Sequence, residues 1–368
     1  MKVQLLDLHA QYENIMSEIK EEMDKVFANH NYILGNQVKD FENTMQDYLE
    51  VNHAIACASG TDALVLALRA LQVGPGDEVI TTPFTFFATA GSIARVGAVP
   101  VFVDVDEDTF NINPDLIEAA ITDKTKAIIP VHLFGQPAEM DKIMEIAKRH
   151  HLKVIEDNAQ GIGSKYAGKY SGSIGDIGTL SFFPSKNLGC MGDGGMCITQ
   201  DEQLGKDLVQ LRKHGENPQY FHKWVGYNSR LDTLQAAVLN VKIKYLEGWS
   251  DGRRKNAKLY YEKLADIKEI KLPVIHEKAT TVYNQFTLQA ERRDELMAFL
   301  KENQIGCAIY YPKPLHIQEC FENLGYKEGD LPIAEKLAKK AVSIPIYTEL
   351  PEEHQLFVIE KIREFYNK

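Results

Sequence analysis

The chain has 368 residues, of which 44% are apolar and 25% charged, and its formal net charge is −11. This length suits one large domain with a smaller one, or two comparable domains. The acidic balance argues against a surface that coats nucleic acid, because neutralising phosphates requires clustered Lys and Arg. The first residues carry an early acid and no signal-peptide core, and no apolar run is long enough to span a membrane. We therefore expect a cytoplasmic protein without nucleic-acid or membrane partners.

The first part of the chain alternates short β-rich runs with helix-like segments. The runs VFVDV and AIIPV are nearly all apolar, as a sheet covered on both faces requires. Between the strand candidates lie helix-like patterns such as Asp141–His150. Strand, helix and strand in succession predict an α/β domain with a mostly parallel seven-stranded sheet flanked by helices. The seven predicted strands are His53–Ala58, Glu78–Thr81, Val99–Val105, Lys126–Val131, Lys153–Asp157, Gly178–Phe183 and Gly195–Thr199.

A long helix is predicted around Leu231–Trp249, and the pattern then changes. The strand-like runs YNQFTLQA, CAIYY and VSIPIY alternate with a helix predicted over Glu291–Asn303. A closing amphipathic helix should start at Pro351. It should present one apolar side made of Leu356, Ile359, Ile362 and Phe365. We expect a large domain over residues 1–248 and a smaller C-terminal α+β domain over residues 249–368.

The five cysteines form an odd set without paired metal-ligand spacing. Reduced thiols in a cytosolic protein are the better interpretation. An HExxH-type arrangement is also absent, and we expect no metal site. The cysteines are Cys57, Cys190, Cys197, Cys307 and Cys320.

The first segment that can carry chemistry is Ser59-Gly60-Thr61-Asp62, between a predicted strand and a strong helix. Gly60 allows close backbone approach, the helix N-terminus offers free N–H groups, and Thr61 adds a hydroxyl donor. These features would suit a phosphate. The segment alone favours a simpler interpretation, in which Ser59 or Thr61 caps the helix.

The second segment is Glu156-Asp157-Asn158-Ala159-Gln160, at the end of the apolar run KVIED. Ligands of open α/β sheets bind beyond the carboxyl ends of the strands. An acid there could face a pyridine nitrogen, keep it protonated and make the ring an electron sink. An N-cap or a surface ion pair explains the segment equally well.

The third segment is SFFPSKN, which ends in Lys186 and Asn187 and precedes the glycine-rich GCMGDGG. A lysine in this aromatic setting can be desolvated, which lowers its pKa and frees the amine for Schiff-base formation. A lone lysine is nearly always a solvated surface residue. Three such segments in this order are far less expected by chance.

The order SGTDAL, EDNAQ, SFFPSKN, GDGG and NSRLDTLQAA resembles the nucleotide-sugar aminotransferases of the DegT family. These are fold-type-I pyridoxal-phosphate enzymes of the aspartate aminotransferase superfamily. The resemblance runs from YILG at Tyr32 to YYPKPLH at Tyr310–His316. It implies pyridoxal 5′-phosphate as cofactor and a homodimer with shared active sites.

The resemblance assigns roles to individual residues. It implies that Lys186 forms the Schiff base and that Asp157 pairs with the pyridine nitrogen. Gln160 should lie near the phenolic oxygen of the ring, and Phe86 should stack on the ring. Asn158 and Gly161 depart from the family habit of small residues such as Ala or Ser, which leaves the local contacts open.

The same resemblance implies a phosphate site and a substrate site. Gly60, Thr61 and Ser181 should hold the 5′-phosphate, and Asn228 should reach it from a second subunit. The nucleotide-sugar should contact Arg230, Tyr310 and Tyr311.

The implied reaction is ping-pong transfer of an amino group from L-glutamate to a nucleotide-linked keto sugar. The run SFFPSKNLG with GDGG resembles the 3-keto branch more than the 4-keto branch, and UDP and dTDP stay open as carriers. The product would serve lipopolysaccharide, another surface glycan or a glycosylated metabolite. A sugar dehydratase on this scaffold would replace Lys186 by histidine, and a nicotinamide-dependent oxidoreductase would need a G-x-G-x-x-G turn. A non-catalytic regulatory protein is the remaining alternative.

Overall fold

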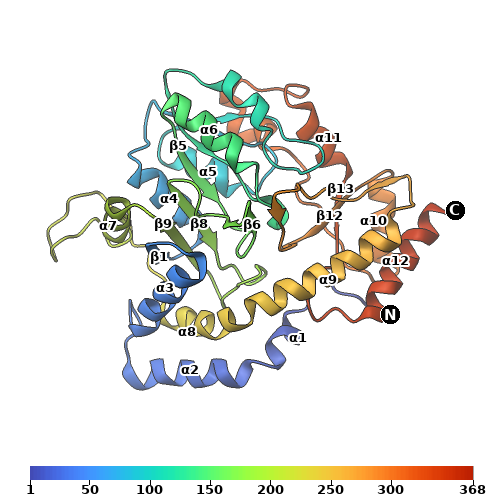
Figure 1. The fold of residues 1–368 in the computed structure, drawn as a ribbon, viewed down its shortest axis with the longest axis horizontal. Coiled ribbons are helices and arrows are strands. Elements are labelled where there is room, and N and C mark those ends of the chain that lie inside the picture. The colour runs from blue at the N-terminus through green and yellow to red at the C-terminus, as the bar shows by residue number, and fades with distance from the viewer. Residues whose placement is uncertain (368) are drawn as a thin grey trace.

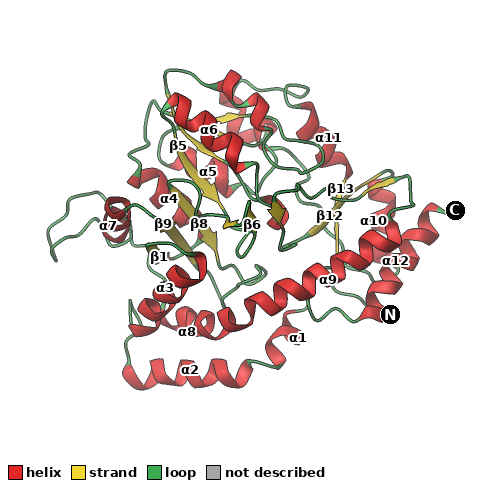
Figure 2. Ribbon diagram, viewed as in Figure 1, coloured by secondary structure: helices red, strands yellow, loops and turns green. Residues whose placement is uncertain are grey.

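The computed structural model describes residues 1–367, and a seven-stranded sheet forms the centre of its first part (Figures 1 and 2). The strand order is β1-β9-β8-β5-β4-β2-β3. Neighbours are parallel except for β9, which is antiparallel to both β1 and β8. The predicted mostly parallel sheet is confirmed. Its strands are β1 (His53–Cys57), β2 (Glu78–Thr81), β3 (Val99–Phe102), β4 (Thr125–Ile129), β5 (Lys153–Asp157), β8 (Ile177–Ser181) and β9 (Gly195–Thr199).

Helices cover both faces of this sheet, as its apolar strands predict. Alternate side chains of β5 separate the faces: Ile155 joins a core with α4, α5 and α7, whereas Val154 joins a core with α6. Helices α3 and α8 cover the part of that second face formed by β1, β8 and β9. The helices are α3 (Asn36–Leu49), α4 (Gly60–Ala70), α5 (Ala88–Arg95), α6 (Met140–His150), α7 (Glu202–Leu211) and α8 (Thr233–Lys242).

The predicted long helix is longer than expected and is interrupted. A 3₁₀ turn at Ile243–Tyr245 separates α8 from α9 (Leu246–Leu264). Helix α9 continues because its buried stripe continues: Leu246 packs beside the large sheet, and Tyr260 packs in the C-terminal core. Figure 1 shows α9 running from α8 towards α12. One helix therefore passes through the division expected at residues 248 and 249, which stays a prediction.

The C-terminal part is an α+β unit with its own core. Its sheet is antiparallel, in the order β10-β12-β13. Tyr260, Phe286 and Ile362 are among the side chains packed between this sheet and its helices. The elements are β10 (Ile270–Lys271), β12 (Phe286–Ala290), β13 (Ala341–Ile344), α10 (Arg293–Glu302), α11 (Pro332–Lys340) and α12 (Glu352–Tyr366).

Short elements connect these two parts. Strand β11 pairs with the hairpin of β6 and β7, so that a segment preceding β12 is tied to the chain that follows β5. The remaining elements are α1 (Leu8–Glu13), α2 (Met16–Asn29), β6 (Lys165–Tyr166), β7 (Lys169–Tyr170), β11 (Ala279–Thr280) and 3₁₀ turns at Pro114–Leu116, Glu118–Ala120, Leu133–Gly135, Leu315–Ile317 and Glu319–Leu324.

Two expectations for the C-terminal part are wrong. The run CAIYY forms no regular strand: Ala308 alone bridges to Ser343, and the chain then leaves the sheet. In α12, Leu356 is 42% exposed, while Val358 is buried. Helical spacing explains the error, because Gln355, Val358, Ile359, Ile362 and Phe365 form the buried stripe and Leu356 lies outside it.

Within residues 1–367, no helix is both long enough and apolar enough to cross a membrane.

Candidate active site

A cavity of about 650 Å³ lies beyond the carboxyl ends of β5 and β8 and beside the N-terminus of α4. This is the edge where open α/β sheets bind ligands. Nine of the eleven predicted site residues line it, although the sequence separates them widely. They are Gly60, Thr61, Phe86, Asp157, Gln160, Ser181, Lys186, Tyr310 and Tyr311.

Asp157 and Lys186 provide opposite charges in this cavity. Asp157 ends β5, and its carboxylate accepts hydrogen bonds from Thr89 Oγ1 at 2.8 Å and from the backbone N–H of Ala159 at 3.2 Å. Burial raises the pKa of Asp157, and the hydrogen bond from Thr89 and the charge of Lys186 oppose this rise. Burial lowers the pKa of Lys186 to about 8, against the pull of Asp157. A far larger fraction of this amine is therefore unprotonated and nucleophilic at pH 7 than for an ordinary lysine, although the charged form still predominates.

A buried pair fixes the strand end that carries Asp157. His132 Nδ1 accepts the backbone N–H of Ala138, so Nε2 carries the proton and donates to Glu156 Oε2 at 2.8 Å. The Glu156 carboxylate also accepts three backbone N–H groups from residues 172–175. Both side chains are fully buried. Sequence reasoning assigned no role to His132 and none to the side chain of Glu156.

Gln160, Tyr311 and Phe86 form a second group on the cavity wall. Gln160 Oε1 accepts the backbone N–H of Phe134 at 2.7 Å, and Nε2 donates to the Tyr311 hydroxyl at 3.1 Å. This leaves one N–H of the Gln160 amide free for a ligand. Phe86 is 59% exposed, and its ring lies 6.3 Å from that of Tyr311. A planar ring could rest against the open face of Phe86.

Ser59 caps the N-terminus of α4, as predicted, and the same helix end also forms a site that could hold an anion. Ser59 Oγ accepts the backbone N–H of Asp62 at 3.1 Å. A Cβ on Gly60 would lie 2.6 Å from the Cβ of Ser181, so only glycine fits there. The first N–H groups of the helix and the hydroxyls of Thr61 and Ser181 border the cavity. These donors suit an anion such as a phosphate.

Asn228 and Arg230 are the two predicted residues outside the cavity wall. Between them, buried Ser229 accepts the backbone N–H of Ala58 at 3.3 Å and donates to Asp62 Oδ2 at 2.7 Å. The segment is therefore anchored beside the N-terminus of α4. Asn228 is exposed and Arg230 is half-buried.

The two departures from the family pattern, Asn158 and Gly161, fit each other. The Asn158 amide donates to the backbone oxygen of Ser171 at 2.8 Å and accepts from the Ser171 hydroxyl at 2.8 Å. A Cβ on Gly161 would overlap Asn158 Oδ1. Gly161 therefore leaves the space that the Asn158 side chain fills.

Several side chains of this site were not predicted. Thr89, which donates a hydrogen bond to Asp157, lies in the first turn of α5, and Phe86 precedes that helix, so helical spacing could not have indicated it. Four further residues that line the cavity are Phe183, Ser185, Asp193 and Gln285. Lys186 is the only basic side chain on the wall in the described part of the chain. No group of three or more His, Cys, Asp or Glu residues that could hold a metal ion occurs within residues 1–367.

Two curated relatives match the chain over nearly its whole length. The "Pleiotropic regulatory protein" of Geobacillus stearothermophilus is 54% identical, over 100% of this chain and 99% of the relative. The UDP-N-acetyl-3-dehydro-alpha-D-glucosamine 3-aminotransferase of Acidithiobacillus ferrooxidans is 46% identical, over 98% and 97%.

A crystal structure of S. venezuelae DesV in complex with a ketimine intermediate superimposes with a TM-score of 0.98. It shares 40% sequence identity with this chain, over 100% of this chain and 99% of that structure. The model of the DegT/DnrJ/EryC1/StrS aminotransferase family matches residues 13–363. The chain therefore belongs to the DegT/DnrJ/EryC1/StrS aminotransferase family.

Proposed function

We propose that this protein is a pyridoxal-phosphate-dependent aminotransferase that converts a nucleotide-linked 3-keto sugar into the 3-amino sugar, with L-glutamate as amino donor. One observation carries the proposal: a buried lysine, whose pKa burial lowers to about 8, shares a cavity with a buried carboxylate at the ligand-binding edge of the sheet. The name of the A. ferrooxidans relative supports amination at C3 of a UDP-linked sugar. The carrier, UDP or dTDP, stays open.

The residues present fit the cofactor. The cradle of Gly60, Thr61 and Ser181 offers neutral donors for a phosphate, and a Cβ at Gly60 would block this cradle. The open face of Phe86 and the remaining N–H of Gln160 suit an aromatic ring with an oxygen substituent. When bound, pyridoxal phosphate supplies an electron sink for the negative charge that develops on the substrate carbon.

The side chains of this chain would then have distinct tasks. Lys186 Nζ would hold the cofactor covalently and, after the amine of the donor has replaced it there, would carry a proton from one carbon to another. The Asp157 carboxylate stabilises positive charge on a ring nitrogen, and Thr89 holds that carboxylate in place. Tyr311 restrains the Gln160 amide. Both half-reactions use the same lysine, and we therefore expect ping-pong kinetics.

We further infer that the enzyme is a homodimer with shared active sites. Asn228 is exposed, and it flanks a serine that is anchored beside the phosphate cradle. We assign Asn228 to the phosphate, and Arg230 to the nucleotide-sugar, in the cavity of the second copy.

Complementation tests the shared site. Lys186→Ala and Asn228→Ala homodimers should each be impaired. After unfolding and refolding as a mixture, they should recover about a quarter of the wild-type sites, because one site of each mixed dimer carries both native residues. Differential tags would show that mixed dimers have formed. If they form without recovery of activity, Asn228 does not belong to the site of the second subunit.

The proposed activity has a direct test. The purified protein with pyridoxal phosphate should be yellow and should lose this colour on addition of L-glutamate. Borohydride reduction should attach the cofactor to the peptide that contains Lys186. A panel of UDP- and dTDP-linked 3- and 4-keto sugars then identifies the acceptor. Label on another residue would overturn the proposal, and turnover of 4-keto sugars alone would overturn the C3 assignment.

The alternatives are less well supported by the site. The name of the G. stearothermophilus relative favours a regulatory protein, but Lys186, Asp157 and Gln160 all line one cavity here. The dehydratase alternative needs a histidine at position 186. A nicotinamide-dependent enzyme needs a glycine-rich turn that the junction of β1 and α4 does not have.

A further inference from the structure

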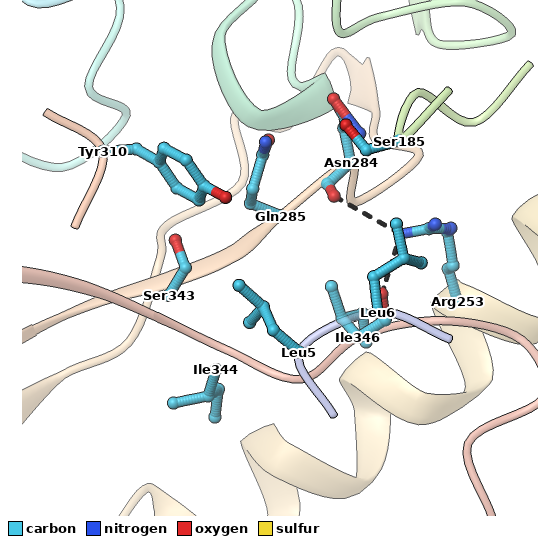
Figure 3. A pocket seen from close by; sticks show the side chains of 10 residues that line it. All are labelled: Leu5, Leu6, Ser185, Arg253, Asn284, Gln285, Tyr310, Ser343, Ile344 and Ile346. Carbon is cyan, nitrogen blue, oxygen red and sulfur yellow. Dashed lines mark hydrogen bonds between the residues drawn. The ribbon is translucent and has the colours of Figure 1, made fainter. Parts of the chain in front are cut away.

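A second, smaller chamber of about 90 Å³ adjoins the cavity (Figure 3). Ser185, Gln285 and Tyr310 line both spaces. Leu5 and Leu6 of the N-terminal segment, with Ile344 and Ile346, form its apolar walls. About 10–15 Å³ of such space is enough to hold one water molecule. The chamber can therefore take a small group such as a carboxylate, and it is too small for a nucleotide-sugar.

Arg253 brings a buried positive charge to this chamber. The side chain extends from α9 and is 4% exposed. Its Nη1 donates to the backbone oxygens of Tyr283 at 3.0 Å, Asn284 at 3.3 Å and Ile346 at 2.8 Å. Figure 3 shows two of these bonds, to Asn284 and Ile346. They fix the guanidinium in orientation but do not neutralise its charge.

Within residues 1–367, no acidic side chain lies within ion-pair distance of Arg253. The carboxylate whose charge reaches it is that of Glu349, and burial raises the pKa of Glu349. Burial lowers the pKa of Arg253 to about 10, so the guanidinium stays charged at neutral pH. An unpaired buried cation is costly, and an anion in the chamber would relieve that cost.

Two amides beside Arg253 are also incompletely bonded. The side-chain oxygens of Asn284 and Gln285 are buried and accept no hydrogen bond within residues 1–367. Buried polar atoms normally have partners. An amino acid would satisfy both needs. Its carboxylate could pair with the Arg253 guanidinium, and its N–H groups could donate to the free amide oxygens.

The lining of the chamber is connected to the segment that carries Lys186. Ser185 precedes this lysine, and Asn187 follows it. The Asn284 amide donates to Asn187 Oδ1 at 3.3 Å, so both neighbours of Lys186 are connected to the lining of the chamber. The rest of a molecule whose carboxylate is bound there could extend into the larger cavity, which Lys186 lines.

We propose that this chamber binds the α-carboxylate of the amino-acid donor, with Arg253 as its cationic partner. This inference rests on the proposed aminotransferase function. The planar guanidinium matches a carboxylate in geometry. It also supplies the charge that the main cavity lacks, because Lys186 is the only basic side chain on that wall in the described chain.

Separate measurement of the two half-reactions tests the assignment. In Arg253→Met, reaction of the pyridoxal form with L-glutamate should lose about 100-fold in kcat/KM, because one partner of a desolvated charge pair is removed. Reaction of the pyridoxamine-loaded protein with a keto sugar that has no carboxylate should change less than about threefold. Arg254→Met is the matched control, since Arg254 is the next residue of α9 and pairs with Asp251 on the surface.

A second pair of variants leaves Arg253 intact. Leu6→Glu places a tethered carboxylate in the chamber, and Leu6→Gln places a neutral group of the same shape there. The KM for L-glutamate should be at least about tenfold higher in Leu6→Glu than in Leu6→Gln. Equal values, or loss of both half-reactions together in Arg253→Met, would overturn the assignment. A wild-type protein without either half-reaction would instead overturn the proposed function.

Discussion

The two walls of the large cavity are built differently. On one wall, Asp157 and Gln160 follow directly from the end of a buried strand, and each is held by buried hydrogen bonds. On the other wall, Gln285 and Tyr310 lie on irregular segments of the C-terminal part. Loops tolerate substitution better than the ends of core strands. The first wall should therefore be the less tolerant of substitution, and the second should vary more readily.

The strongest test of the first wall is Lys186→Ala. Transamination should fall by at least about 10⁴-fold, because the residue serves as nucleophile and as proton carrier. Single-turnover absorbance with L-glutamate measures it. Lys242→Met is the matched control. Lys242 is also buried, and burial lowers its pKa to about 8, but it contacts Tyr12 and does not line the cavity. An equal loss of transamination in Lys186→Ala and Lys242→Met would show that removal of any buried lysine has this effect, whether or not the lysine lines the cavity.

Asp157→Asn should have the next largest effect. Its amide cannot stabilise positive charge on a ring nitrogen, and we expect kcat to fall about 10²- to 10³-fold. Steady-state kinetics with saturating cofactor measure this fall. Thr89→Val keeps the carboxylate and removes the hydrogen bond to it at 2.8 Å, together with the weaker contacts of the same hydroxyl to Thr85 and Phe86, and should cost much less. A rate for Asp157→Asn near that of the wild type would contradict the role of the carboxylate.

The pH dependence of cofactor capture tests the state of the lysine. Only the unprotonated amine attacks an aldehyde, and burial lowers the pKa of Lys186 to about 8. Stopped-flow absorbance should show that capture of pyridoxal phosphate by the apoprotein speeds up about tenfold from pH 7 to pH 9. The charge of Asp157 raises this pKa, so the midpoint should move to lower pH in Asp157→Asn. An unchanged midpoint in Asp157→Asn would show that the charge of Asp157 does not affect the pKa of Lys186.

Tyr311→Phe should have the smallest effect and tests whether the walls act separately. The tyrosine hydroxyl accepts a hydrogen bond from Gln160 and so joins the C-terminal part to the wall that carries Asp157. Its loss should cost about 1 kcal/mol, or roughly fivefold in kcat/KM for the keto sugar. The half-reaction with L-glutamate should change less. Equal losses in both half-reactions would mean that the two walls work as one unit.

The local sequence pattern predicts the wall at the end of β5 better than the wall formed by the C-terminal part. Lys186 and Asp157 were accessible to sequence reasoning because each follows an apolar strand, and parallel strands end at one edge of a sheet. Thr89 and Asp157 are 68 positions apart, and no periodicity joins them. Arg253 looks like any residue of an exposed helix until the fold buries it. Tyr310 and Tyr311 came from the family resemblance alone.

The same limit explains the errors in the fold. Seven strands of the large sheet were recognisable, because both faces are apolar and turn signals separate the strands. The run CAIYY has the composition of a strand, but its aromatic side chains are used on the cavity wall. Whether such a run forms a strand or lines a cavity depends on contacts with distant parts of the chain.

The contact between positions 158 and 161 constrains which substitutions this chain can accept there. An asparagine at 158 is tolerated only while 161 carries no side chain, and a methyl group at 161 requires a smaller neighbour at 158. A side chain cannot be added at 161 before the asparagine at 158 is replaced, so a route between the two arrangements passes through a glycine at 161 paired with a small residue at 158. Residues beside the reactive strand end can thus be exchanged only in a fixed order.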